Sequence, residues 1–160
     1  MALKVGNPAP VFSLPDGKGN IIHLAELKGK RVVLYFYPRD NTPACTKEAC
    51  SFRDSYSGFQ EKDVVVLGVS TDDAKSHEKF TTKLALPFQL LTDADGQVAT
   101  AYESYGLKKF MGKEYYGTNR STFLLGKTGK IVKIFNKVKP EGHSKEILEY
   151  FKAKDKNQNS

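Results

Sequence analysis

The sequence contains no tryptophan, only two cysteines and no long apolar run. Two cysteines are too few for a disulfide-dense secreted scaffold or for a four-cysteine zinc site. No stretch approaches the roughly 20 apolar residues of a membrane-spanning helix, and residues 1–10 lack the apolar core of a secretory signal. We therefore expect no membrane segment and a reducing compartment, most simply the bacterial cytoplasm, or an organelle such as the chloroplast if a leader has been removed.

Arginine is also scarce. The chain carries 25 basic and 18 acidic residues, for a formal net charge of +7, but only four of the basic residues are arginine. Proteins that bind nucleic acids favour clustered arginine, because its guanidinium contacts phosphates and bases through two donors. The lysines here are scattered along the chain, so the charge indicates a solvated surface rather than nucleic-acid binding.

The chain does contain enough apolar material for one core. Its 160 residues are 39% hydrophobic, with ten Phe and eight Tyr, and a chain of this length buries roughly 70% of its unfolded surface. It shows no internal repeat and no linker. We predict a single domain over residues 1–153 and a flexible polar tail over residues 154–160.

Two buried strands and a helix between them organise the predicted fold. Residues 31–37 and 64–69 are continuous β-branched and aromatic runs, typical of strands that are buried on both faces. Between them, apolar residues follow helical spacing from Cys45 to Phe59, which predicts one amphipathic helix. A strand, a helix and a strand of these lengths predict a right-handed βαβ unit with parallel strands.

The remaining patterns complete an α/β sandwich. A turn over residues 15–19 separates two short apolar segments that favour a hairpin, and a Gly-Lys-Thr-Gly turn joins the last two strands into another. The prediction is a mixed central sheet with helices on both faces. Further strands are predicted at residues 21–24, 88–91, 121–125 and 131–135, and further helices at residues 74–84, 97–102 and around 147–151.

Residues with chemical potential concentrate where the first buried strand meets the helix, which is the usual ligand position of α/β sheets. Pro38 ends the strand, Thr42 is placed to be the helix N-cap, and Pro43 takes the first helical position. Cys45 then falls in the first turn, where unpaired amides and the positive end of the helix stabilise a thiolate. The same position also suits a small core residue, so the helix alone leaves both interpretations open.

A second cysteine, Cys50, follows five residues later. Five helical residues advance about 7.5 Å and turn about 140°, which separates the two Cα atoms by roughly 8–9 Å. A disulfide needs Cα atoms within about 6.8 Å. The pair can therefore form a disulfide only if the start of the helix unwinds; the alternative is a half-exposed Cys50 with no partner. Four intervening residues exclude the C-x-x-C motif of thioredoxin.

The sequence offers little for a metal or a cofactor. His23, His77 and His143 are isolated and form no H-x-x-x-H or H-E-x-x-H pair, so we expect them on the surface. Asp93 and Asp95 resemble the start of a calcium loop but lack the remaining ligands, and a turn that caps a helix explains them better. No glycine-rich phosphate-binding motif occurs. We expect neither a metal nor a cofactor.

Several segments together carry a resemblance. Residues 38–45 match the pattern P-x-x-x-T-x-x-C, and Cys45 and Cys50 form a C-x-x-x-x-C pair. The likeness continues in residues 7–16, 86–93 and 119–124. The chain resembles the peroxiredoxins, in particular the branch of bacterioferritin comigratory protein, or peroxiredoxin Q. Ala44 stands where glycine is commoner in this branch, and alanine suits a first helical turn at least as well.

The resemblance implies a thioredoxin-like three-layer fold and a thiol peroxidase that reduces hydrogen peroxide and organic hydroperoxides. Cys45 would attack the O–O bond and become a sulfenic acid, which Cys50 would resolve as an intramolecular disulfide. Thioredoxin, or a glutaredoxin-type reductant, would recycle it. Thr42 would hydrogen-bond the peroxide, Arg120 would stabilise the thiolate and the transition state, and Pro38 would shield the sulfur. Because resolution needs no second subunit, the resemblance favours a monomer.

The residues alone leave alternatives open. Arg120 would otherwise be an ordinary surface arginine, and Arg53 is a poorer partner because eight helical residues place it roughly 12 Å from Cys45. For Glu48 we expect only a backbone contact near the opened helix. Two other functions also fit a reactive thiol: a disulfide oxidoreductase, and a redox sensor or interaction domain that uses its basic surface.

Overall fold

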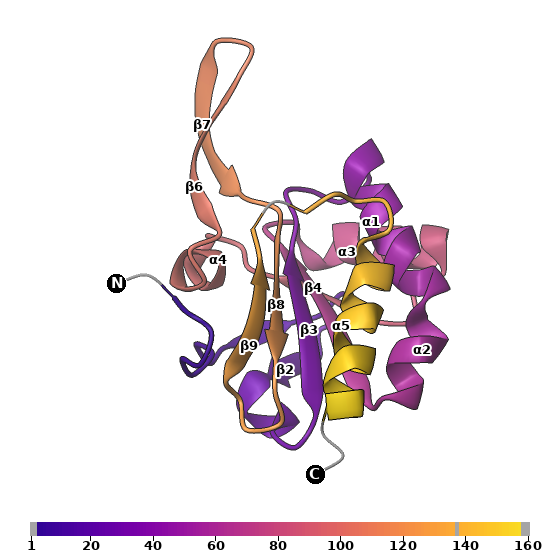
Figure 1. The fold of residues 1–160 in the computed structure, drawn as a ribbon. Coiled ribbons are helices and arrows are strands. Elements are labelled where there is room, and N and C mark those ends of the chain that lie inside the picture. Colours follow the sequence, from indigo (N-terminus) through magenta and orange to yellow (C-terminus); the bar gives the residue numbers. More distant parts are fainter. Residues whose placement is uncertain (1–2, 137, 158–160) are drawn as a thin grey trace.

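The computed structural model describes residues 3–136 and 138–157. They form three layers, of which a mixed sheet is the middle one (Figure 1). The strand order is β5-β4-β3-β8-β9. β3, β4 and β5 are mutually parallel, whereas β8 runs antiparallel to both β3 and β9. The parallel βαβ pair and the terminal hairpin are confirmed. The strands are β3 (Arg31–Phe36), β4 (Val64–Ser70), β5 (Gln89–Thr92), β8 (Ser121–Leu125) and β9 (Ile131–Phe135).

The two faces of the sheet carry separate cores, because successive residues of β3 point to opposite sides. Val33 and Tyr35 face one core, and Val32 and Leu34 face the other. Figure 1 shows the larger helices on one side of the sheet and α4 on the other. The first core is covered by α1 (Pro43–Asp54), α2 (Tyr56–Glu61), α3 (Ala74–Leu84) and α5 (His143–Asn157). The second is covered by β1 (Ser13–Pro15), β2 (Ile21–His23), η1 (Leu24–Leu27) and α4 (Gln97–Ala101).

The single helix predicted after β3 is in fact two helices. α1 ends and α2 begins at Ser55, whose backbone leaves the helical range at ψ 6°. The hydroxyl of Ser55 lies 2.9 Å from that of Ser144, so this serine side chain is engaged with α5 at the break. The apolar stripe nevertheless continues across it, since Phe52 and Phe59 are both fully buried.

A two-stranded ribbon that projects from the body was not predicted (Figure 1). It consists of β6 (Tyr105–Phe110) and β7 (Lys113–Thr118). Its turn residues Met111 and Gly112 both have positive φ, 51° and 78°, as a type I′ turn requires. The sequence signal is weak because apolar and polar residues do not alternate along the two strands and the turn is Met-Gly instead of Asn-Gly.

The predicted polar tail begins too early. α5 continues to Asn157, because Asp155 is held by Arg31 at 2.5 Å and by Lys62 at 2.9 Å. The prediction is wrong for residues 154–157, and residues 158–160 lie outside the described part of the chain. Within the described ranges, no helix has the length and apolar character to cross a membrane.

Two of the three histidines expected on the surface are buried. His77 is 0% exposed and lies on the inner face of α3 with Phe80, whereas His143 is 1% exposed and bonds the hydroxyl of Thr122 at 2.8 Å. Only His23 is exposed. The expectation failed because a neutral or paired imidazole can occupy a core position once its nitrogens have partners.

Candidate active site

Cys45 lies in the first turn of α1, just beyond the C-terminal end of β3. Thr42 is the N-cap and Pro43 the first helical residue, as the sequence predicts. Proline has no amide, and the side chain of Thr42 makes no capping bond. The amides of Ala44 and Cys45 therefore have no partner within the helix, and the positive end of α1 lies at the sulfur.

The sulfur of Cys45 has a cationic partner. The Cys45 side chain is 2% exposed, and its Sγ accepts a hydrogen bond from Nη2 of Arg120 at 3.2 Å. Arg120 precedes β8, and β8 pairs with β3 so that Ser121 lies opposite Phe36. Because of this antiparallel pairing, Arg120 lies next to the C-terminal end of β3, where the loop that leads to Cys45 begins.

The same guanidinium also binds Glu48, a residue whose importance the sequence did not reveal. Nη1 of Arg120 donates to Oε1 of Glu48 at 2.5 Å. The Glu48 side chain is 0% exposed, and its Oε2 has no hydrogen-bond partner among the described residues. Burial raises the pKa of Glu48 to about 7, although the charge of Arg120 opposes this shift. Glu48 therefore changes charge near neutral pH.

A usable signal for Glu48 was present in the sequence. Glu48 follows Cys45 by three residues and precedes Phe52 by four, so it belongs to the apolar face of the helix. An acidic residue on a buried face needs a cationic partner. Arg120 is also a candidate neighbour of Cys45. A buried Glu48 that needs a cation and an Arg120 beside Cys45 together indicate a Glu48–Arg120 ion pair.

The other predicted residues occupy different positions around this centre. Pro38 is half-buried at the end of β3. The hydroxyl of Thr42 donates to the carbonyl of Arg39 at 3.2 Å, so its single proton is not directed at the sulfur. Cys50 is half-buried on the unbroken helix α1, and both thiols are free. Arg53 bonds the carbonyl of Leu84 at 2.8 Å and takes no part in the centre.

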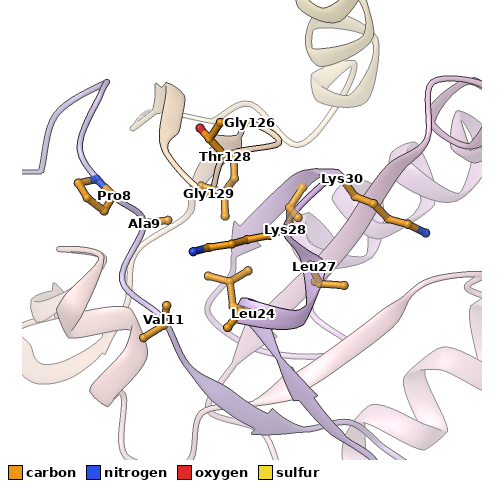
Figure 2. A pocket seen from close by; sticks show the side chains of 13 residues that line it. Pro8, Ala9, Val11, Leu24, Leu27, Lys28, Lys30, Gly126, Thr128 and Gly129 are labelled. Carbon is orange, nitrogen blue, oxygen red and sulfur yellow. The ribbon is translucent and has the colours of Figure 1, made fainter.

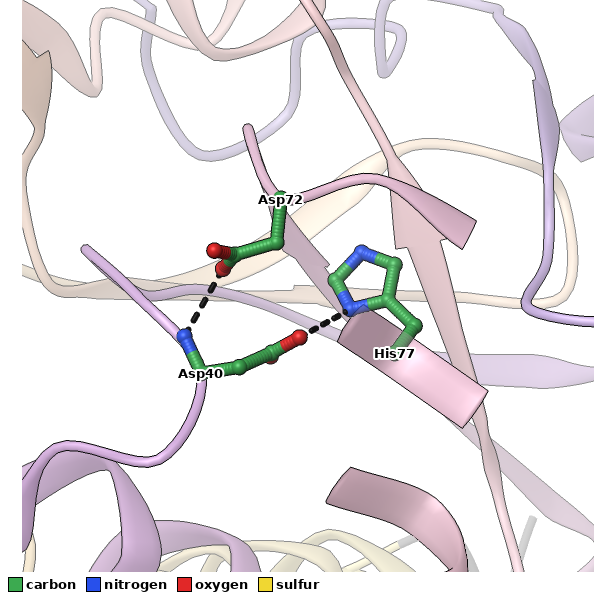
Figure 3. A group of neighbouring side chains, drawn as sticks. All are labelled: Asp40, Asp72 and His77. Atoms are coloured by element: carbon green, nitrogen blue, oxygen red, sulfur yellow. Dashed lines mark hydrogen bonds and ion pairs between the residues drawn. The ribbon is translucent and has the colours of Figure 1, made fainter. Parts of the chain in front are cut away.

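The loop between β3 and α1 is fixed by a buried polar network (Figure 3). Oδ2 of Asp40 lies 2.7 Å from Nδ1 of His77, and the amide of Asp40 donates to Asp72 at 2.7 Å. Tyr37 donates to the second oxygen of Asp40 at 2.5 Å. The Nε2 of His77 donates to the carbonyl of Leu91 at 3.0 Å. The network attaches the loop to β4, β5 and α3 just before the cysteine.

Asp40, Asp72 and His77 are also residue types that bind metals, and their ligand atoms lie within 4.8 Å of one another. Two ligands of one ion, each about 2.1 Å from it, lie about 3 Å or more apart. The 2.7 Å between Asp40 and His77 is instead a charge-assisted hydrogen-bond distance. The geometry indicates a structural network and not a metal centre.

A hollow of about 120 Å³ lies at another part of the molecule (Figure 2). It is formed by the N-terminal segment, η1 and the β8–β9 turn, and includes Pro8, Leu24 and Gly129. The stem of Lys28 crosses it: a Cβ placed on Gly129 would lie 3.5 Å from Cε of Lys28. None of the candidate active-site residues lines this hollow.

Comparison with known proteins agrees with the resemblance. Residues 5–134 match the model of the AhpC/TSA family. Peroxiredoxin Bcp from Bacillus subtilis is 47% identical over 152 residues, which cover 95% of this chain and 97% of that protein. The solved structure of a PrxQ mutant from Xylella fastidiosa has a TM-score of 0.91 at 32% identity, and covers 97% of this chain and 99% of its own.

A second structural neighbour is the bacterioferritin comigratory protein of Xanthomonas campestris, solved in a study of its alkyl peroxide reduction activity. It has a TM-score of 0.87 at 33% identity and covers 94% of this chain and 99% of its own. These neighbours are thioredoxin-fold peroxiredoxins, so the predicted fold class is confirmed. The family match, the curated relative and the structural neighbours agree: the chain belongs to the AhpC/TSA family, within the Bcp/PrxQ branch of the peroxiredoxins.

Proposed function

We propose that the protein is a thiol peroxidase in which Cys45 reduces hydrogen peroxide and organic hydroperoxides. The observation that supports this most directly is the guanidinium of Arg120, which lies 3.2 Å from the buried sulfur of Cys45. The thiolate attacks one peroxide oxygen, the O–O bond breaks, and Cys45 becomes a sulfenic acid. The other oxygen leaves as hydroxide or alkoxide and takes a proton to become water or an alcohol.

Charge moves from sulfur to the leaving oxygen in this step, so donors placed there accelerate the reaction. Arg120 supplies one donor group, and the unpaired amides at the start of α1 supply others. The Thr42 hydroxyl joins them once it turns from the carbonyl of Arg39, to which it donates in the free protein. Pro38 limits the access of water at the end of β3.

Cys50 then resolves the sulfenic acid: a Cys45–Cys50 disulfide forms and one water is released. Since the two cysteines lie on one regular helix, roughly 8–9 Å apart at Cα, the start of α1 must unwind. The polar network at Asp40 holds the preceding loop, and the buried Phe52 holds the remainder of α1. Unwinding is therefore confined to the segment that contains both cysteines.

Oxidation should accordingly raise backbone amide exchange over residues 43–52, because unwound residues lose their helical hydrogen bonds. Hydrogen exchange with mass spectrometry compares the reduced and the oxidised chain. Peptides from α3 serve as the internal control, since the network at His77 stays intact. The same exchange in both redox states would contradict the unwinding step.

Replacing Cys50 with serine separates the first step from the second. We expect Cys50→Ser to reduce its first equivalent of peroxide at close to the native rate but not to turn over, because no thiol is present to form the disulfide. Mass spectrometry should show sulfenic acid at Cys45, followed by sulfinic acid when peroxide is in excess. Sustained turnover with thioredoxin in this variant would contradict the role of Cys50.

We further propose that thioredoxin recycles the disulfide and that the protein acts as a monomer in the cytoplasm. The decisive experiment measures the peroxide reaction of the reduced chain by competition with horseradish peroxidase, because the chain has no tryptophan to report it. Recycling is then measured with thioredoxin and its reductase, and in parallel with a glutaredoxin system. Fast oxidation without recycling by either would favour a redox sensor.

A further inference from the structure

Lys108 is a lysine on a projecting ribbon, yet its side chain is half-buried. Its ammonium donates to the backbone carbonyl of Thr118 at 2.9 Å. Its stem passes over Gly117, where a Cβ would lie only 3.3 Å from Cδ of the lysine. The side chain therefore runs across the ribbon to the end of β7 instead of extending into solvent.

This position places the ammonium beside the candidate active site. The carbonyl that binds it belongs to Thr118, a buried residue two positions before Arg120, and Arg120 contacts the Cys45 sulfur. The charges of this site act on the lysine. Burial lowers the pKa of Lys108, the charge of Arg120 lowers it further, and the negative charge of Cys45 opposes both.

The charges around the sulfur explain what a second cation contributes. Among the described residues, the titratable groups around Cys45 include Glu48 from α1, Tyr35 from β3, Arg120 ahead of β8 and Lys108 from β6. Burial raises the pKa of Tyr35 well above its usual range, so its phenol is neutral. When Cys45 and Glu48 are both ionised, two negative charges share one guanidinium, and each disfavours the other.

We propose that Lys108 is a positioning residue that supplies the second positive charge of the site, which keeps Cys45 a thiolate while Glu48 is ionised. The β6–β7 ribbon is then part of the catalytic apparatus: it carries a cation to a sulfur that lies on a different element. This inference rests on the proposed peroxidase function and concerns the pH range over which that function operates.

The chain supplies a matched control in the next residue. Lys109 has the same charge, lies on the same strand and points to the other face of the ribbon, where it is exposed and pairs with Glu114 at 3.5 Å. Removing either charge changes the net charge of the protein equally. Lys108 is held against the segment that leads to Arg120, so its removal should change the field at Cys45 far more than removal of the solvated, paired Lys109 does.

The test measures the pH dependence of the peroxide rate constant in Lys108→Met, Lys108→Arg and Lys109→Met. For Lys108→Met we expect the midpoint of the profile to move up by about one pH unit, because the loss of a nearby positive charge raises the pKa of a thiol. The rate at pH 7 should fall about 3- to 10-fold. Lys108→Arg should restore the profile, and Lys109→Met should match the native protein.

A second readout is independent of turnover. In the Cys50→Ser background, the ultraviolet absorbance of the Cys45 thiolate is followed against pH, and Lys108→Met should shift this titration in the same direction as the rate profile. A uniform rate loss at every pH, or a profile like that of Lys109→Met, would overturn the inference. Such a result would leave the peroxidase function intact, whereas a native chain that does not consume peroxide would reject that function itself.

Discussion

Replacing Cys45 with serine is expected to abolish peroxide reduction, with a loss of about 10⁴-fold or more, comparable to the removal of a nucleophile from other enzymes. The donors around the sulfur stabilise an anion that a thiol can form near neutral pH and an aliphatic hydroxyl cannot. Serine differs from cysteine by one slightly smaller atom, so the packing of α1 is retained and the hydroxyl still faces Arg120, which contacts the sulfur in the native protein. The loss is therefore chemical and not structural.

Peroxide consumption in competition with horseradish peroxidase measures this loss directly. Cys50→Ser is the matched control, since it removes the half-buried thiol of the same helix and should leave the first reaction fast. Near-native consumption by Cys45→Ser would show that another group attacks peroxide. The assignment of the nucleophile would then be wrong, whatever the family relationship.

The part of the fold that sequence patterns predicted is the part governed by burial on two faces. Apart from Arg31 and Ser70 at their ends, β3 and β4 are apolar and almost entirely buried, so their runs identify them as central parallel strands. The helix start at Thr42 and Pro43 was likewise predictable, because the preference for threonine just before a helix and for proline at its first position depends on local sequence. Cys45 could be placed at the end of this strand because strand, cap and cysteine are consecutive in the chain.

The parts that sequence patterns missed depend on contacts between distant segments. Glu48 acquires its role from Arg120, 72 residues away, and His77 is buried because Asp40 and the Leu91 carbonyl bind its two nitrogens. Along the β6–β7 ribbon, exposed apolar residues such as Leu107 and Tyr116 are mixed with charged ones without a period of two, so the sequence pattern does not mark it. Lys108 could not be assigned to the site without knowing that this ribbon exists.

Arg120→Met is expected to lower the peroxide rate constant by about 10²- to 10³-fold, the usual effect of removing one preorganised donor from a developing charge. Lysine at this position should recover part of the rate, because it restores the charge but cannot bind the sulfur and Glu48 with one planar fork. The competition assay measures both variants. Rates within threefold of the native value would exclude a role for the Arg120–Cys45 contact in the transition state.

The same substitution separates catalysis from stability, because it leaves Glu48 buried without a cation. The pKa of Glu48, about 7 in the native protein against an ordinary value of 4.5, must rise further when the charge of Arg120 is removed. The folded variant then binds a proton that the unfolded chain releases, so its stability is full at low pH and declines as the pH rises from about 4.5 through the folded pKa. Urea unfolding at about pH 6 and pH 8 should show the larger destabilisation at pH 8.

Adding Glu48→Gln to Arg120→Met should remove most of this pH dependence, since no buried carboxyl is left to titrate. It should not restore the peroxide rate, because the donor to the sulfur is still missing. Recovery of both properties in the double variant would mean that Arg120 acts only by neutralising Glu48. If only stability recovers, the two nitrogens of the guanidinium have separate roles. The bond from Nη1 to Glu48 stabilises the fold, and the bond from Nη2 to Cys45 serves the reaction.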